Sequence, residues 1–201
     1  MVGYRIDTTT LREVPQDVGA TWERVEELER QGADGDGERV VWLRILGALA
    51  SAERLAWADS ARHAGPGSLA ELPLAAAGGV PPTAWRPLLR LAQVMHRRGR
   101  LDAADEAVEA VRRAARVADD ASRGDDVARR DCSAVLAFAD QVHGAMHFDA
   151  GRDAEAVHLF SSALERRTRD GAPADQVESS RIALEAAAVR AARVRSRPGR
   201  V

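Results

Sequence analysis

Two histidines on one predicted helix are the residues of this sequence best placed to bind a metal. His143 and His147 are four positions apart, so both rings point to the same side of a helix. Asp140 lies about one turn earlier and can supply a carboxylate oxygen as a third ligand. The histidines do not enclose an acidic residue as a metalloprotease helix does, and no second ligand motif follows. Two interpretations stay open: a metal site, or two partly buried histidines hydrogen-bonded to neighbouring carboxylates, which is the one we favour.

Other groups that could do chemistry are scarce. The single cysteine, Cys132, excludes an internal disulfide and a paired-cysteine zinc site, and its place within a predicted helix is typical of a packing residue. The chain has no lysine, which excludes a Schiff-base lysine and a phosphate-loop lysine. We therefore lean toward a protein without catalytic residues and without a bound cofactor.

The composition indicates a helical protein. Of 201 residues, 45% are apolar, 30% are charged and only 4% are aromatic, and alanine is abundant; this mixture favours helices over strands. All 29 lysine-or-arginine residues are arginine, which is typical of a GC-rich bacterial genome of the actinobacterial type. The net charge of −2 gives no general attraction to nucleic acid or an anionic membrane. With neither a signal pattern nor an apolar run of the roughly 18–20 residues that span a bilayer, we expect a cytoplasmic protein.

The pattern along the chain divides it into four segments. Residues 1–16 show no clear period and are predicted to be irregular. Residues 17–170 form a helical domain, in which Gly-Gly and Pro-Pro pairs at 78–83 mark a possible inner boundary. Residues 171–195 predict a C-terminal capping helix, and 196–201 a basic tail. No acid interrupts the arginines near this end, which are Arg190, Arg193, Arg195, Arg197 and Arg200.

Apolar residues at helical spacing, with glycines at the ends of the runs, predict about seven main helices and an all-α fold. Residues 38–65 predict one long helix or two abutting ones. The capping-box spacing within 68–71 predicts a further short helix. Thr83 and Asp102 are expected to cap the N-termini of two later helices.

Two segments share a glycine followed by small and large apolar residues. The matching positions are Gly99, Ala104, Val108 and Val111 in the first segment and Gly151, Ala156, Phe160 and Ala163 in the second. A glycine turns the chain, an alanine lets two helices approach closely where they cross, and a large residue one turn later fills the space beside it. The pattern predicts two tightly packed antiparallel helix pairs.

This pattern resembles the tetratricopeptide repeat (TPR) family, in which leucine, glycine and tyrosine on a first helix meet alanine, phenylalanine and alanine on a second. The matching residues on the first helices are Leu88, Leu91, Ala92, Met95 and Gly144. The two glycine turns are 52 residues apart, whereas the family repeat is roughly 34 residues long. The helices must therefore be longer, or an extra segment intervenes. The resemblance implies helix pairs stacked into a short right-handed superhelix.

The resemblance also implies a scaffold or regulatory protein whose first helices line a concave groove for a peptide or partner protein. Aligned with the family, the partner-binding residues are Arg86, Gln93, His96, Arg97, Gln141 and Asp149. The four from the first repeat are cationic or hydrogen-bonding, which suits a carboxylate or an acidic partner segment.

Other classes of function stay open at this point. A small-molecule-binding or metal-binding protein, or a biosynthetic enzyme, would have its site near His143 and His147. A regulatory domain of a transcription system is a third class, but no helix-turn-helix is recognisable, and nucleic acid is not an expected partner. An acidic N-terminal helix and the basic tail of a second copy could also meet in a homodimer.

Overall fold

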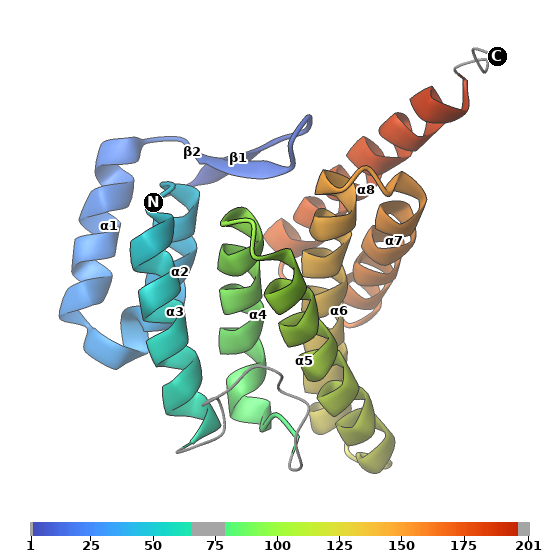
Figure 1. Ribbon diagram of the computed structural model, residues 1–201. Helices are drawn as coiled ribbons and strands as arrows, with labels where there is room; N and C mark the ends of the chain where they lie inside the picture. The colour runs from blue at the N-terminus through green and yellow to red at the C-terminus, as the bar shows by residue number, and fades with distance from the viewer. Residues whose placement is uncertain (1, 66–78, 197–201) are drawn as a thin grey trace.

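The computed structural model describes residues 2–65 and 79–196, and within them the chain forms eight α-helices preceded by a β-hairpin (Figure 1). In chain order the elements are β1 (Tyr4–Asp7), β2 (Arg12–Pro15), α1 (Val18–Arg30), the 3-10 turn η1 (Gly32–Gly35), α2 (Asp36–Ile45), α3 (Leu49–Ala64), α4 (Pro82–Arg97), α5 (Leu101–Ala121), α6 (Asp126–Asp149), α7 (Asp153–Arg169) and α8 (Ala174–Arg195). The predicted all-α class is confirmed. No helix among these residues is both long and apolar enough to cross a bilayer. The short helix predicted at 68–71 and residues 197–201 of the predicted tail lie outside the described residues.

Glycines end the helices that precede the two repeat segments, as predicted. After α4, Gly99 adopts a φ of 77°, a left-handed conformation that ends the helix and that glycine adopts without strain. Its N–H donates to the carbonyl of His96 and the N–H of Arg100 to the carbonyl of Met95, both at 2.9 Å. These bonds satisfy the last carbonyl groups of the helix. Gly151 adopts a φ of 72° and ends α6 in the same way.

Residues 38–65 form two helices, one of the two arrangements predicted, because Gly47, with a φ of 78°, interrupts the right-handed conformation between α2 and α3. Two other predicted boundaries need correction. Thr83 lies inside the first turn of α4 rather than before it, and its hydroxyl donates to the carbonyl of His63 at 2.8 Å. Asp102 lies one residue inside α5, which has no side-chain cap at its N-terminus.

The N-terminal segment, residues 1–16, was predicted to be irregular but contains the hairpin. β1 pairs with β2 in antiparallel register, with Asp7 opposite Arg12. The Asp7 carboxylate accepts the backbone N–H groups of Thr9 (2.8 Å) and Thr10 (3.1 Å), which fixes the turn. Strands of four residues are too short to establish a period in the sequence.

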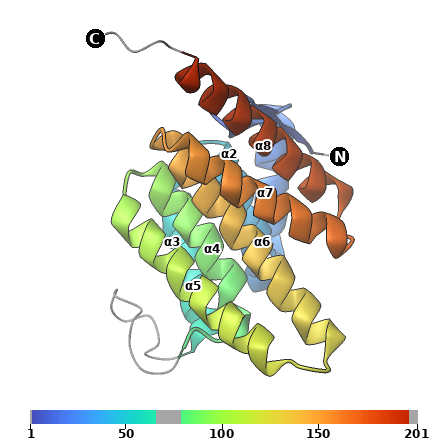
Figure 2. The ribbon, with the colours of Figure 1, turned by 90° about the vertical axis from the view of Figure 1, so that its right-hand side faces the viewer.

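The helices pack in two layers. Each helix from α2 to α8 makes its most extensive contacts with its neighbours along the chain, as expected of antiparallel helices joined by short turns. In addition, α2 contacts α4, α4 contacts α6 and α6 contacts α8, whereas α3, α5 and α7, all within the described residues, do not contact one another to a similar extent. The even-numbered helices therefore share one layer and the odd-numbered helices the other (Figures 1 and 2).

The predicted repeat residues lie where consecutive helices cross. Six of them are completely buried: Ala104, Val108, Val111, Ala156, Phe160 and Ala163. A Cβ atom added at Gly144 on α6 would lie 2.6 Å from Cε1 of Phe160 on α7, so only glycine allows this approach. The spacing of 52 residues between the glycine turns comes from long helices, since α5 has 21 residues and α6 has 24.

A second apolar cluster joins the C-terminal helices to the hairpin. Its buried members are Phe148, Ala156, Phe160, Ala183 and Ala187 of α6, α7 and α8. Leu11, at the end of the hairpin turn, packs against this cluster. Leu11 has a φ of 52°, the one left-handed non-glycine residue in the described part of the chain. The hairpin therefore reaches across the end of α4 toward α8, as Figure 1 shows.

We expect the effect of Gly144→Ala on stability to change sign when the ring of Phe160 is removed. Gly144→Ala should destabilise the protein, because overpacking costs about 1–3 kcal/mol and exceeds the roughly 1 kcal/mol gained from alanine's helix propensity. Phe160→Ala alone should cost about 3–5 kcal/mol. In that background, Gly144→Ala should become stabilising, because the ring is gone. Urea unfolding of the four proteins measures both signs, and additive effects would show that the contact is not formed.

Candidate functional site

A groove of about 740 Å³ lies on the even-numbered layer, between α2, α4, α6 and the start of α8. Its apolar lining includes Val41 and Trp42 from α2 and Phe138 from α6. Arginines surround these apolar groups: Arg44, Arg86, Arg90, Arg130, Arg166 and Arg167. Four acidic residues also line the groove, so its formal charge is positive: Glu13, Glu38, Asp170 and Asp175.

Most of these acids already have an arginine partner. Arg44 holds Glu13 with two hydrogen bonds of 2.6 and 2.9 Å. Burial alone would raise the pKa of Glu13, but the Arg44 guanidinium lowers it below its usual value. Glu38 is bound by Arg24 of α1 at 2.8 Å, which lowers the pKa of Glu38. Asp170 is bound at 2.8 Å by its neighbour Arg169, which lies outside the groove.

Arg90 is the arginine in this groove that has the least compensation. No carboxylate among the described residues lies within 4.0 Å of it. Burial lowers its pKa, which the more distant Asp59 carboxylate offsets only in part, and the nearby Arg86 lowers it further. Its guanidinium lies against the backbone of α2, where a Cβ atom at Gly37 would be 2.9 Å from Nη1. Arg86, one turn earlier on α4, pairs with Asp131 at 2.7 Å, and both side chains are more than 40% exposed. Such a surface pair contributes little to stability and can exchange partners.

A smaller cavity, of about 80 Å³, lies at the hairpin end of the groove. Its wall is formed by residues 10–13 of the hairpin together with parts of α4, α6 and α8. His96 lies here with its Nε2 atom 3.4 Å from the Asp149 carboxylate. The pKa of His96 is lowered by its burial and, to a smaller degree, by Arg97 and Arg12. Burial also lowers the pKa of Arg97, and Arg12 and Arg44 lower it further.

The six predicted partner-binding residues are thus shared between two neighbouring hollows. Five of them line the small cavity: Gln93, His96, Arg97, Gln141 and Asp149. Arg86 lines the groove, and Gln93 and Gln141 line both hollows. They were predicted from the resemblance to the TPR family, and all six lie on α4 or α6.

The sequence interpretation missed Arg90 and the residues of the hairpin. Arg90 follows Arg86 by four positions and precedes Gln93 by three, so helical periodicity alone could have included it. Arg12 and Glu13 had no such signal, because strands this short show no period and their place over α4 is a long-range contact.

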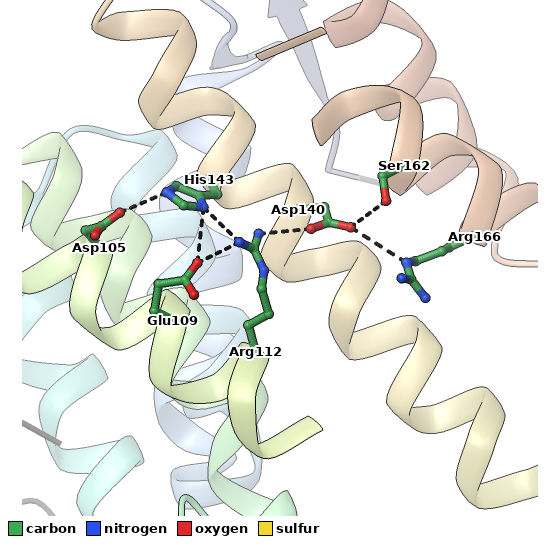
Figure 3. A network of polar contacts seen from close by, with 7 residues as sticks. All are labelled: Asp105, Glu109, Arg112, Asp140, His143, Ser162 and Arg166. Carbon is green, nitrogen blue, oxygen red and sulfur yellow. Dashed lines mark hydrogen bonds and ion pairs between the residues drawn. The ribbon is translucent and has the colours of Figure 1, made fainter. Parts of the chain in front are cut away.

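Of the two histidines of the candidate metal site, His143 belongs to a polar network between α5, α6 and α7 (Figure 3), whereas His147 Nδ1 is buried without a hydrogen-bond partner in the part of the chain that the structure describes. His143 Nε2 lies 2.8 Å from Asp105 Oδ1, and an Arg112 N–H group lies 3.1 Å from His143 Nδ1. Arg112 also donates to Asp140 at 2.9 Å and to Glu109 at 2.6 Å. A guanidinium can only donate, so Nδ1 of His143 is the acceptor and Nε2 carries the proton toward Asp105.

This arrangement does not suit a metal ion at Asp140, His143 and His147. The buried guanidinium of Arg112 lies between the first two, where a cation would have to be (Figure 3). The second oxygen of Asp140 accepts the Ser162 hydroxyl at 2.9 Å. His147 packs beside His143, with ring centroids 4.7 Å apart. In the described part of the chain, no three histidine, cysteine or acidic residues form a group that could hold a metal ion.

The arginines near the C-terminus do not all belong to a solvated tail. Arg190 lies on α8 with its guanidinium carbon 3.4 Å from the centre of the Phe148 ring. It also pairs with Asp153 at the start of α7 at 2.5 Å. Arg190 therefore holds α8 against α6 and α7 and is unavailable to a separate partner.

Comparison with known proteins returned no match: no protein-family model, curated protein or solved structure matches this chain.

We expect the Arg112–Asp140 pair to be structural. Asp140→Leu should cost up to about 3–5 kcal/mol of unfolding free energy, because it removes the buried carboxylate of Arg112 and leaves, among the described residues, only the half-buried Glu109 to neutralise it. Arg112→Leu combined with Asp140→Leu should cost less than the two single changes together. Arg113→Gln, one position away and exposed, is the matched control and should change stability by less than about 0.5 kcal/mol. Denaturant unfolding measures all four proteins; strictly additive losses would contradict the coupling.

The buried histidines should make stability depend on pH below neutrality. The pKa values of His96 and His147 are lowered from 6.5, in both cases first by burial. The unfolded chain therefore binds more protons, and the stabilisation present above pH 6.5 is lost as the pH falls through the folded-state values. The unfolding free energy should decrease from neutral pH toward about pH 5. His96→Gln with His147→Gln should flatten that decrease, and an unchanged slope would contradict the assignment.

Proposed function

We propose that this protein is a non-catalytic, cytoplasmic interaction module of the TPR-like type, which holds an acidic segment of a partner protein in the groove on α2, α4, α6 and α8. The observation that carries the proposal is Arg90, half-buried in the groove wall without a carboxylate partner among the described residues. A guanidinium so placed binds a carboxylate with two parallel hydrogen bonds.

The surroundings of Arg90 support the same ligand chemistry. Trp42, Val41 and Phe138 offer apolar surface beside the arginines, so the groove suits a segment that carries both acidic and apolar side chains. Three of the four acids in the lining are bound by arginines and do not compete for Arg90. The close helix crossing at Gly144 and the inner layer of even-numbered helices support the TPR-like reading.

The alternative, a small-molecule or metal site around His143 and His147, has less support. Both nitrogen atoms of His143 already face protein groups, and Asp140 is bound by Arg112 and Ser162. The neighbouring hollow beside His147 is open to solvent on one side and is lined by Arg112, His143 and His147 together with side chains of α7. One buried atom there, Nδ1 of His147, has no hydrogen-bond partner among the described residues, but no acidic residue of the described chain completes a metal site with it.

The test compares short fluorescent peptides that share the same apolar residues but carry glutamate, serine or lysine at the polar positions. Fluorescence anisotropy should detect binding of the glutamate peptide alone. Arg86→Gln with Arg90→Gln should weaken that binding by about tenfold or more, since a desolvated charged hydrogen bond contributes about 1.5–3 kcal/mol. Binding should also weaken as salt is added.

The matched control removes the same charge elsewhere. Arg113→Gln with Arg116→Gln changes two exposed arginines of α5 that do not line the groove. This control should bind the glutamate peptide as the parent does. Equal binding of the glutamate and serine peptides, or equal loss in the control, would refute the proposal.

A further inference from the structure

The small cavity under the hairpin holds more positive charge than its own carboxylates neutralise. Three guanidinium groups line it, from Arg12 on β2, Arg44 on α2 and Arg97 on α4. Arg44 is neutralised by its two hydrogen bonds to Glu13. For Arg12 and Arg97, no carboxylate in the described part of the chain lies within 4.0 Å. The charges of these two side chains are therefore left facing one cavity.

Two like charges in a small, partly buried space repel each other, and the low local dielectric increases the cost. The lowered pKa of Arg97, caused by burial and then by Arg12, reflects the same repulsion. The acids that line the cavity are Glu13, which Arg44 binds, and Asp149, which lies 3.4 Å from His96, and neither lies within 4.0 Å of Arg12 or Arg97. An anion from solution would remove the repulsion and complete the hydrogen bonding of both guanidinium groups.

We propose that the cavity binds a phosphate group, either inorganic phosphate or the terminal phosphate of a small molecule, between Arg12 and Arg97. Two guanidinium groups match the nearly doubly charged phosphate, whose three acceptor oxygens can be shared between two planar donors. The amides of Gln93 and Gln141 line the same cavity and add neutral donors. A volume of about 80 Å³ accommodates such a group but not a segment of polypeptide. This site is distinct from the peptide groove, although the two adjoin.

Binding here would link the hairpin to the helices. Arg12 belongs to the hairpin and Arg97 to α4, and the hairpin also touches the helices through Glu13, Leu11 and the ring of Tyr4, which packs edge-on against Trp42. A phosphate held by both arginines adds a bridge between elements that are far apart in the sequence. The bound ligand therefore stabilises the position of the hairpin over the end of the groove.

The experiment uses the full chain and three probes at matched ionic strength: inorganic phosphate, glycerol phosphate and acetate. Isothermal titration should detect binding of at least one phosphate compound, and the same compound should raise the melting temperature as its concentration increases. Acetate should bind about tenfold more weakly or not at all. Preference for inorganic phosphate identifies the free ion as ligand, whereas preference for glycerol phosphate identifies a phosphate monoester. Acetate binding as tightly as both phosphates would overturn the proposal.

Arg12→Gln and Arg97→Gln should each weaken phosphate binding by about tenfold or more. Arg5→Gln, which removes an exposed arginine from β1 of the same hairpin, is the matched control and should bind as the parent does. Arg12 is itself exposed, so its substitution tests the site without endangering the fold. Hydrogen exchange of the β1 and β2 amides should slow when phosphate is added to the parent but not to Arg12→Gln.

Equal phosphate binding by all four proteins would refute the site. Because the peptide test depends on Arg86 and Arg90 and this one on Arg12 and Arg97, either proposal can fail while the other stands.

Discussion

The close approach of consecutive helices is the constraint on which the rest of this structure depends. On α6 and α7 it is set by Gly144, which leaves room for the buried ring of Phe160, and by the fully buried Ala156 and Ala163. Long helices packed this tightly with their sequence neighbours must place every second helix on the same side. The even-numbered layer, and with it the groove, follows from the small residues at the crossings.

The hairpin determines how this groove ends. Glu13 inserts a carboxylate against the buried Arg44, and Leu11 reaches the apolar cluster at Phe148 and Phe160. A buried ion pair adds little net stability, because desolvation offsets most of the attraction between the charges. The pair of Glu13 and Arg44 nevertheless favours one position of the hairpin on the helices over other positions. The twelve residues of the hairpin, Tyr4 to Pro15, thereby separate the small cavity from the larger groove.

The sequence predicted those features that depend on local periodicity. The burial of Ala104, Val108 and Phe160 follows from their spacing along single helices. Gln93, His96, Arg97, Gln141 and Asp149 were predicted from the resemblance to the TPR family, and the structure finds them around one cavity. Features that depend on another element were not predictable. His143 meets Arg112 only because of the register between α5 and α6, which no pattern within α6 encodes. The hairpin was missed because its four-residue strands are too short to show a period and because its position over α4 is a long-range contact.

The partners of the arginines distinguish structural from functional cations in this lysine-free chain. Arg44, Arg112 and Arg190 are each held by a carboxylate from another element, so their charge serves packing between helices. Arg90 and Arg97 are half-buried, yet in the described residues neither has a carboxylate within ion-pair distance. Burying a cation is costly unless something compensates it. Arg167 also has no carboxylate partner in the described part of the chain, but it donates to neutral acceptors of α8, the carbonyl of Gln176 and the hydroxyl of Ser180. Arg90 and Arg97 both lie on α4, one lining the groove and one the cavity. An anionic ligand would therefore be bound most favourably on this side of α4, where two partly buried guanidinium groups have no carboxylate partner among the residues described.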